Sequence, residues 1–349
     1  MNMPAPTSEK ITTRVKHNQE SAWRRWAQLK DRLERQDLLI IDGATGTEIE
    51  RRGGKMDNKG WSSCAQLTAP NIVQEVHEAY LKAGADIIIA NTYATNRNVM
   101  NAAEFGADTQ GAIWAALRLA NVAGERFQSM RPAGPWIAGS LSTHPPAIPT
   151  GLEAGNDSCY PPAMKEEEAY IEAAESMIQG DPSCDMLWLE MMQNRDHAPR
   201  AIRAAAGCGL PIFLGISTRI TSDGKIYLRG SDESESGPTL FTREVFREFL
   251  ELAGKNLVGI NIMHTNFSAM LPTLRLVRAF GWNGPLGAYP DHGHFTMPHW
   301  VFAEIQMGDA MELVKTWIDE SGVQLVGGCC GLGPEFIEGL VKLRNSLKG

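Results

Sequence analysis

Eight short apolar runs divide the chain between residues 38 and 326, and each ends in a polar or glycine-containing turn. Near-continuous apolar runs of four to six residues are typical of parallel strands whose two faces are both covered. We therefore predict strands at residues 38–41, 85–90, 135–138, 185–189, 212–216, 257–262, 285–288 and 323–326.

Amphipathic helical patterns separate most of these runs. Apolar side chains recur every three or four positions, which is the spacing of one buried helix face. The pattern predicts helices at residues 22–35, 71–83, 112–127, 166–178, 243–252, 270–280 and 301–318, and a last helix after Pro334. Residues 1–20 are polar, and we expect them to be irregular.

Strands that alternate with helices eight times indicate an α/β fold, the (β/α)8 TIM barrel. We expect one barrel domain over residues 37–349, with an N-terminal extension and capping helix over residues 1–36. Three longer segments, at residues 53–65, 143–162 and 221–238, follow strand ends. They should therefore lie on the catalytic face of the barrel.

The composition limits the function. The chain has 349 residues, a formal net charge of −8 and no apolar run of 18 residues, so we expect neither a nucleic-acid partner nor a membrane partner. Six cysteines in a chain of this length do not form a disulfide framework, and the N-terminus lacks the apolar core of a secretory signal. A cytoplasmic setting fits these features, and formation of an oligomer is left open.

Two adjacent cysteines follow the last predicted strand, in the sequence Val-Gly-Gly-Cys-Cys-Gly at 326–331. At a strand end the backbone can turn both side chains to one side, so Cys329 and Cys330 can bind one metal ion. The alternative is a pair of small buried thiols. The flanking glycines and the strand-end position favour the metal site.

The other predicted strands also end in polar side chains, which in a TIM barrel face the active site. Among them are Asn91, Ser140, Asn261, His264 and Tyr289. The first strand leads into the turn Asp-Gly-Ala-Thr-Gly-Thr-Glu at 42–48, which lacks the lysine of a phosphate loop.

That turn suits an amino acid as ligand. Asp42 and Glu190 could take its ammonium group, and the backbone amides of Gly43 and Ala44 could take its carboxylate. The alternative is a simple helix-capping turn.

Several segments carry a family resemblance. They are the turn at 42–48 with Arg52-Gly53 after it, the stretch Val-His-Glu-Ala-Tyr-Leu-Lys-Ala-Gly-Ala-Asp at 76–86, Asn-Thr-Tyr at 91–93, Gly-Ile-Asn at 259–261, Tyr-Pro at 289–290 and Gly-Gly-Cys-Cys-Gly at 327–331. From residue 38 to about residue 346 the chain resembles the homocysteine methyltransferase family. The resemblance implies the eight-stranded barrel, zinc held by three cysteines, and methylation of the homocysteine thiol.

The chain departs from that family at three positions. Ile262 stands where the family has its first zinc cysteine, Met191 stands where threonine is usual after Glu190, and Asp291 stands where asparagine is usual. His264 lies two residues beyond Ile262, on the same face of an extended strand, and could supply the third ligand. The alternative is that His264 is a polar loop residue and that the metal is lost or is held by His292 or His294.

The chemistry that these residues imply is methyl transfer to a zinc-held thiol, from a sulfonium or quaternary ammonium donor. We assign catalytic roles to Glu190 and Tyr93, and substrate contacts to Asp42, Gly43, Ala44, Glu190, Asn261 and Tyr289. Aromatic faces for the donor cation could come from Trp61, Tyr93, Trp188 and Tyr289. A lyase or hydrolase on the same barrel, and a non-catalytic amino-acid-binding relative, are the alternatives.

Overall fold

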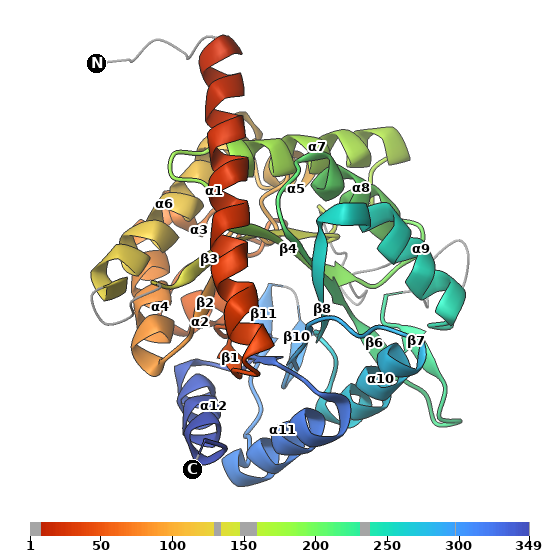
Figure 1. The fold of residues 1–349 in the computed structure, drawn as a ribbon. Helices are drawn as coiled ribbons and strands as arrows, with labels where there is room; N and C mark the ends of the chain where they lie inside the picture. Colours follow the sequence, from red (N-terminus) through yellow and green to blue (C-terminus); the bar gives the residue numbers. More distant parts are fainter. Residues whose placement is uncertain (1–7, 129–133, 147–158, 231–237, 297, 349) are drawn as a thin grey trace.

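Eight parallel strands form a nearly closed barrel in the computed structural model of the chain (Figure 1). The structure describes residues 8–128, 134–146, 159–230, 238–296 and 298–348. The barrel strands are β1 (Leu39–Ile40), β2 (Ile87–Ala90), β3 (Trp136–Ser142), β4 (Met186–Met192), β5 (Ile212–Ile216), β8 (Leu257–Met263), β9 (Leu286–Tyr289) and β12 (Leu325–Val326).

Neighbouring barrel strands follow one another in the sequence. Their order is β1-β12-β9-β8-β5-β4-β3-β2, and an isolated parallel bridge between Ile41 and Ile87 joins β1 to β2. All eight predicted strands are present, and the predicted TIM barrel is confirmed.

The strands are apolar because both of their faces are buried. One face packs against the surrounding helices, as Ile88, Ile260 and Ile262 do. The other face fills the barrel interior, where Trp188 and Phe213 stack with ring centroids 4.4 Å apart.

The helices that cover the barrel lie close to their predicted places. Those with predicted counterparts are α4 (Pro70–Ala83), α6 (Thr109–Phe127), α7 (Ala163–Gln179), α9 (Arg243–Ala253), α10 (Phe267–Ala279), α11 (Met307–Ser321) and α12 (Pro334–Ser346). The sequence analysis missed α2 (Thr45–Arg51), α3 (Ala65–Thr68), α5 (Arg97–Ala102) and α8 (Ala198–Gly207). The buried face of α8 is mostly alanine, which gives a weak apolar signal.

The N-terminal helix α1 (Ser8–Glu34) crosses the end of the barrel where the strands begin (Figure 1). Leu29 and Leu33 are buried there, and the Trp26 ring meets Phe213 edge-on at 5.8 Å. The prediction of irregular chain up to residue 20 is wrong from Ser8 onward, and residues 1–7 lie outside the described part. Polar contacts order this stretch, since the Asn18 amide donates to the carbonyl of Ile178.

Two antiparallel hairpins rise from the carboxyl-terminal side of the barrel. They are β6 (Thr218–Ile220) with β7 (Ile226–Leu228), and β10 (His294–Thr296) with β11 (His299–Val301). The predicted helix at 301–318 is therefore wrong at its start, because Val301 is in β11 and α11 begins at Met307. Parts of two predicted insertions, residues 147–158 and 231–237, lie outside the described residues.

No helix in the described ranges is long and apolar enough to cross a membrane.

Candidate active site

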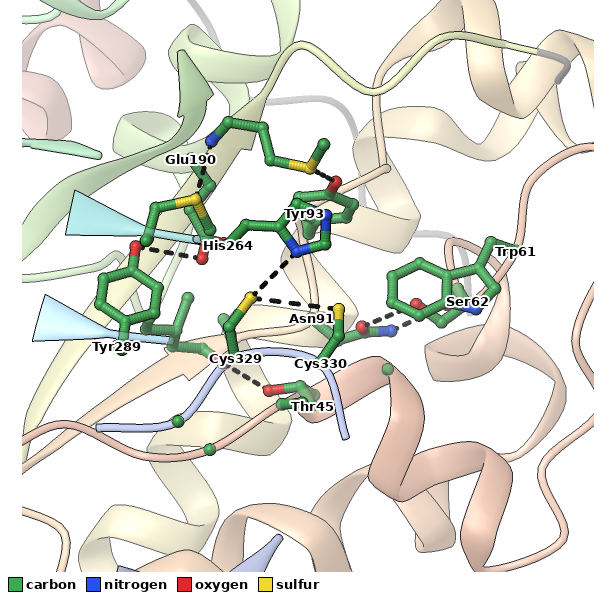
Figure 2. A pocket seen from close by; sticks show the side chains of 18 residues that line it. Thr45, Trp61, Ser62, Asn91, Tyr93, Glu190, His264, Tyr289, Cys329 and Cys330 are labelled. Atoms are coloured by element: carbon green, nitrogen blue, oxygen red, sulfur yellow. Dashed lines mark hydrogen bonds between the residues drawn. The ribbon is translucent and has the colours of Figure 1, made fainter. Parts of the chain in front are cut away.

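A cavity opens at the carboxyl ends of the barrel strands (Figure 2). Its floor and walls come from the turn after β1, the segment at Trp61, the end of β2, the end of β4, the end of β8 and the turn after β12. The predicted residues that line it are Gly43, Ala44, Trp61, Asn91, Tyr93, Glu190, His264, Tyr289, Cys329 and Cys330, and Met191 lines it as well.

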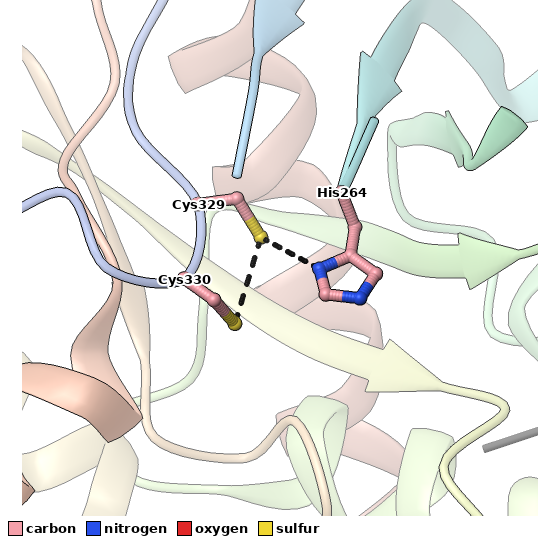
Figure 3. Close-up of side chains that lie close together, drawn as sticks. All are labelled: His264, Cys329 and Cys330. Atoms are coloured by element: carbon pink, nitrogen blue, oxygen red, sulfur yellow. Dashed lines mark hydrogen bonds between the residues drawn. The ribbon is translucent and has the colours of Figure 1, made fainter. Parts of the chain in front are cut away.

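Two thiols and one imidazole converge at the edge of this cavity (Figure 3). The Cys329 Sγ lies 3.6 Å from the His264 Nδ1 and 4.0 Å from the Cys330 Sγ. The candidate ligand atoms of all three residues lie within 4.8 Å of one another. A hydrogen bond with Cys330, together with burial, raises the pKa of the Cys329 thiol well above its ordinary value. A thiol in this position keeps its proton unless a cation takes the proton's place.

His264 reaches the cysteines through its backbone conformation. Its φ is 43°, in the left-handed region that residues other than glycine rarely adopt. The expectation that residues 262 and 264 share a strand face is wrong. Ile262 packs in the core between barrel and helices, β8 ends at Met263, and His264 lines the cavity beyond the strand. The strand periodicity ends at Met263, and the left-handed residue then turns the imidazole back over the cavity.

The alternative histidines lie elsewhere. The His292 Nε2 is 2.8 Å from the carbonyl oxygen of Glu304, and His294 is exposed on the hairpin strand β10. The structure therefore groups His264 with the cysteines, and it groups neither His292 nor His294 with them.

An ion pair lies behind His264. The Arg229 guanidinium donates from Nη1 to the Asp291 Oδ2 (2.7 Å) and to the carbonyl oxygen of His264 (2.6 Å). The same Asp291 oxygen is 3.7 Å from the His264 Nδ1. Sequence reasoning missed Arg229, because its position depends on the hairpin β6–β7, which the apolar pattern did not predict.

Glu190 is buried at the end of β4. Its carboxylate accepts hydrogen bonds from the Ser140 hydroxyl and from the Tyr289 hydroxyl, the latter at 3.3 Å. Burial raises the pKa of Glu190 to about 7, although both hydrogen bonds act to lower the pKa. A cationic partner beside this carboxyl group would stabilise its ionised form and lower its pKa.

Asp42 and Asn261 lie beneath the cavity and are not among the residues that line it. The Asp42 Oδ2 accepts a hydrogen bond from the backbone N–H of Ile89 (2.8 Å), and burial raises the pKa of this carboxyl well above its ordinary value. The Asn261 side chain is fully buried, and neither of its polar atoms has a hydrogen-bond partner among the described residues. Of the predicted pair for an ammonium group, only Glu190 faces the open space.

Aromatic rings form one wall of the cavity. Trp61 meets Tyr93 edge-on with centroids 5.8 Å apart, and Phe295 from the hairpin β10–β11 packs on Trp61 at 6.2 Å. Trp188 does not belong to this wall, contrary to expectation, because it is fully buried in the barrel interior. The Tyr93 hydroxyl donates to the thioether sulfur of Met191.

The sequence analysis also missed His144. The strand β3 runs on to Ser142, beyond the predicted end at residue 138, so His144 is carried to the aromatic rings of the cavity wall, where its ring lies 5.5 Å from Tyr93 and 6.2 Å from Trp61. Burial, followed by the charge of His264, lowers the pKa of His144 to about 4. The polar positions Ser140 and Ser142 resembled a strand end, although they occupy alternate positions of one strand face.

Backbone strain gathers at the same site. Among the described residues, three of the five non-glycine residues with positive φ line the cavity, namely Trp61 (51°), Met191 (55°) and His264 (43°). Such conformations persist only where surrounding contacts enforce them, and they concentrate at functional sites.

The sequence of the chain is similar to those of known methyltransferases. A sequence model of the family described as homocysteine S-methyltransferase matches residues 39–343. The chain is 27% identical over 320 residues to homocysteine S-methyltransferase of Escherichia coli (strain K12), covering 89% of this chain and 97% of that protein. It is 26% identical over 335 residues to selenocysteine methyltransferase of Astragalus bisulcatus, covering 88% of this chain and 92% of that protein.

Solved structures show the same barrel. The metallated crystal form of the homocysteine methyltransferase MmuM from Escherichia coli matches with a TM-score of 0.64 and 23% identity, covering 89% of this chain and 98% of that chain. At this level of identity the likeness concerns the fold.

Proposed function

Because the chain belongs to the homocysteine S-methyltransferase family, and is therefore an S-methyltransferase, we propose that it moves a methyl group from an onium donor to the thiol of homocysteine at a zinc centre. In this reaction the donor's C–S or C–N bond breaks, a new S–CH3 bond forms, the thiol proton is lost and the donor leaves as a neutral molecule. The product of homocysteine is methionine.

The convergence of His264, Cys329 and Cys330 is the observation that carries this proposal. Two sulfur atoms and one nitrogen atom are a ligand set that zinc accepts, and catalytic zinc sites commonly use three protein ligands with a fourth position open. The set therefore fits zinc, although an imidazole stands in place of one cysteine. Bound there, zinc would lower the pKa of the acceptor thiol and so supply a thiolate at neutral pH.

The amino-acid end of the acceptor fits the opposite part of the cavity. Glu190 is the carboxylate that an ammonium group can meet there, and Ser140 and Tyr289 hold it in place. The backbone of the turn at Gly43 and Ala44 lines the same space and offers amides for the acceptor's carboxylate.

The aromatic wall suits the donor. Trp61 and Tyr93 present ring faces and edges beside the cysteines, and a cation over such rings gains roughly 0.5–2 kcal/mol. This attraction favours a charged sulfonium or quaternary ammonium donor and is lost when the neutral product forms. The Tyr93 hydroxyl, directed at Met191, fixes the ring beside the reacting groups.

The test combines metal analysis with methyl transfer. Purified protein should contain one zinc per chain and should methylate homocysteine from at least one member of a panel of sulfonium and quaternary ammonium donors. Cys329→Ser and His264→Ala should bind zinc more weakly and lose activity together. Cys208→Ala, which removes a buried thiol far from the cavity, is the matched control and should keep both. A wild-type protein that stays inactive toward the whole panel after zinc reconstitution would refute the proposal.

A further inference from the structure

The left-handed backbone at His264 needs contacts that enforce it. Without them, the residue would relax to the β or α region, and its imidazole would leave the cysteines. The contacts at this point therefore decide whether His264 can act together with Cys329 and Cys330.

Arg229 and Asp291 supply such contacts from two sides. One guanidinium nitrogen, Arg229 Nη1, donates one hydrogen to the His264 carbonyl oxygen at 2.6 Å and the other to the Asp291 Oδ2 at 2.7 Å. The Asp291 Oδ2 in turn lies 3.7 Å from the His264 Nδ1. The ion pair thus holds the backbone of His264 directly, and its carboxylate lies beside the imidazole without a hydrogen bond to it.

Both members of the pair are themselves anchored. The backbone N–H of Arg229 donates to the Ser217 carbonyl at the end of β5 (3.0 Å). Asp291 lies between Pro290, whose carbonyl accepts from the Cys329 N–H at 2.7 Å, and His292, whose N–H donates to the Cys330 carbonyl at 2.9 Å. The carboxylate is therefore fixed relative to the cysteine turn.

The second carboxylate oxygen of Asp291 also points to a functional role for this residue. Asp291 is 4% exposed, and its Oδ1 is buried with no hydrogen-bond partner among the described residues. A buried carboxylate that served stability alone would be expected to satisfy both oxygens. An oxygen left without a partner beside a thiol–imidazole group indicates that the carboxylate serves that group.

We propose that Arg229 and Asp291 are positioning residues that hold the His264 imidazole in place as the third zinc ligand. The inference rests on the proposed function, since it takes His264 to complete the ligand set. Here the pair would act through the backbone of His264, and the loss of an outer-shell partner that positions a ligand typically lowers metal affinity by about 10–100-fold.

The experiment measures the zinc affinity of the full chain by competition with a chromophoric chelator at fixed pH. Arg229→Met removes both hydrogen bonds and keeps the aliphatic bulk, whereas Asp291→Asn keeps the shape and removes the charge. Each should weaken zinc binding by about 10–100-fold. Arg229→Met should also lower the melting temperature of the metal-free protein, because it leaves the Asp291 carboxylate buried without its cation. If Arg229→Met does not fold, the near-isosteric Asp291→Asn carries the prediction.

A double-variant cycle separates positioning from a general effect on the fold. In a His264→Ala background, adding Arg229→Met should cost less than about threefold in zinc affinity, because the residue through which Arg229 acts is gone. Arg195→Met is the matched control, since Arg195 pairs with Glu248 on an exposed surface, and it should leave the affinity unchanged.

The outcomes are distinct. Wild-type affinity in both Arg229→Met and Asp291→Asn, or an equal loss in the presence and absence of His264, would overturn the inference and leave the proposed zinc site standing. Unchanged affinity in His264→Ala would overturn the inference and the proposed ligand set together.

Discussion

Glu190 offers a prediction whose size can be worked out from the structure. Burial raises the pKa of Glu190 from an ordinary value of 4.5 to about 7 in the folded chain. At about 1.4 kcal/mol per pKa unit, this difference corresponds to roughly 3 kcal/mol. Ionising Glu190 in its buried position costs that free energy, whereas ionising it in the unfolded chain does not.

The sign follows from proton binding. Between pH 4.5 and about 7 the folded chain holds a proton on Glu190 that the unfolded chain has lost, so the free energy of unfolding falls as the pH rises. This contribution of Glu190 to the free energy of unfolding is fully present below pH 4.5 and is lost above about pH 7. Glu190→Gln cannot ionise, so the stability difference between wild type and variant should change by roughly 3 kcal/mol across this window.

The assay is urea denaturation of the two metal-free proteins from pH 4 to pH 8, with only their difference interpreted, because the other titrating groups then cancel. Ser140→Ala is the companion variant. Its hydroxyl donates to the Glu190 carboxylate and lowers its pKa, so its removal should extend the fall in stability to higher pH. A wild-type-minus-Glu190→Gln difference that is flat with pH would show that burial does not raise this pKa.

The same carboxylate makes a second measurement possible. If Glu190 meets the ammonium group of the acceptor, the ion pair lowers the pKa of the carboxyl, and acceptor binding should release a proton near pH 6. At pH 8, Glu190→Gln should raise the KM for homocysteine roughly 10–150-fold, the effect of losing one charged hydrogen bond. An unchanged KM would mean that the ammonium group binds elsewhere.

Three further outcomes are expected. Cys330→Ala should abolish methyl transfer, and the metal-free protein should melt as the wild type does because the thiol lies outside the packed barrel. Full activity in this variant would refute the proposed metal site. Gly331→Ala should destabilise the chain by about 1–3 kcal/mol in urea denaturation, since its φ is 85° and a Cβ would lie 1.9 Å from the His292 carbonyl oxygen, whereas Gly308→Ala, where a Cβ meets open space, should not destabilise it. Trp61→Leu should raise the donor KM about 2–30-fold with little change for the acceptor, and an equal rise for both would argue against a cation site on this ring.

The sequence was sufficient to predict the barrel, because each barrel strand is buried on both faces and therefore forms an apolar run. It was also sufficient to place Glu190, Cys329 and Cys330 at the cavity, since their strands end where the apolar runs end. Strand β3 is the exception, because Ser140 and Ser142 interrupt its apolar run.

The remaining contacts depend on features that have no periodic signal. His264 turns to the cysteines through a left-handed backbone that the alternation of a strand cannot encode. Arg229 and Phe295 arrive on short hairpins whose three-residue strands mix buried with partly exposed residues, so their pattern resembles that of a loop. Contacts of this kind join segments far apart in the chain, and local preference does not reveal them.

The helix that crosses the barrel floor has a consequence for the opposite end of the molecule. Trp26 meets Phe213, Phe213 stacks on Trp188, the Trp188 indole donates to the Tyr289 hydroxyl at 2.9 Å, and that hydroxyl donates to Glu190 at 3.3 Å. A continuous column of aromatic side chains thus runs along the barrel axis from the N-terminal helix to the carboxylate in the cavity. Tilting the helix at one end would shift the stack on which Tyr289 rests, so the depth and shape of the cavity are set partly by a segment at the far end of the barrel.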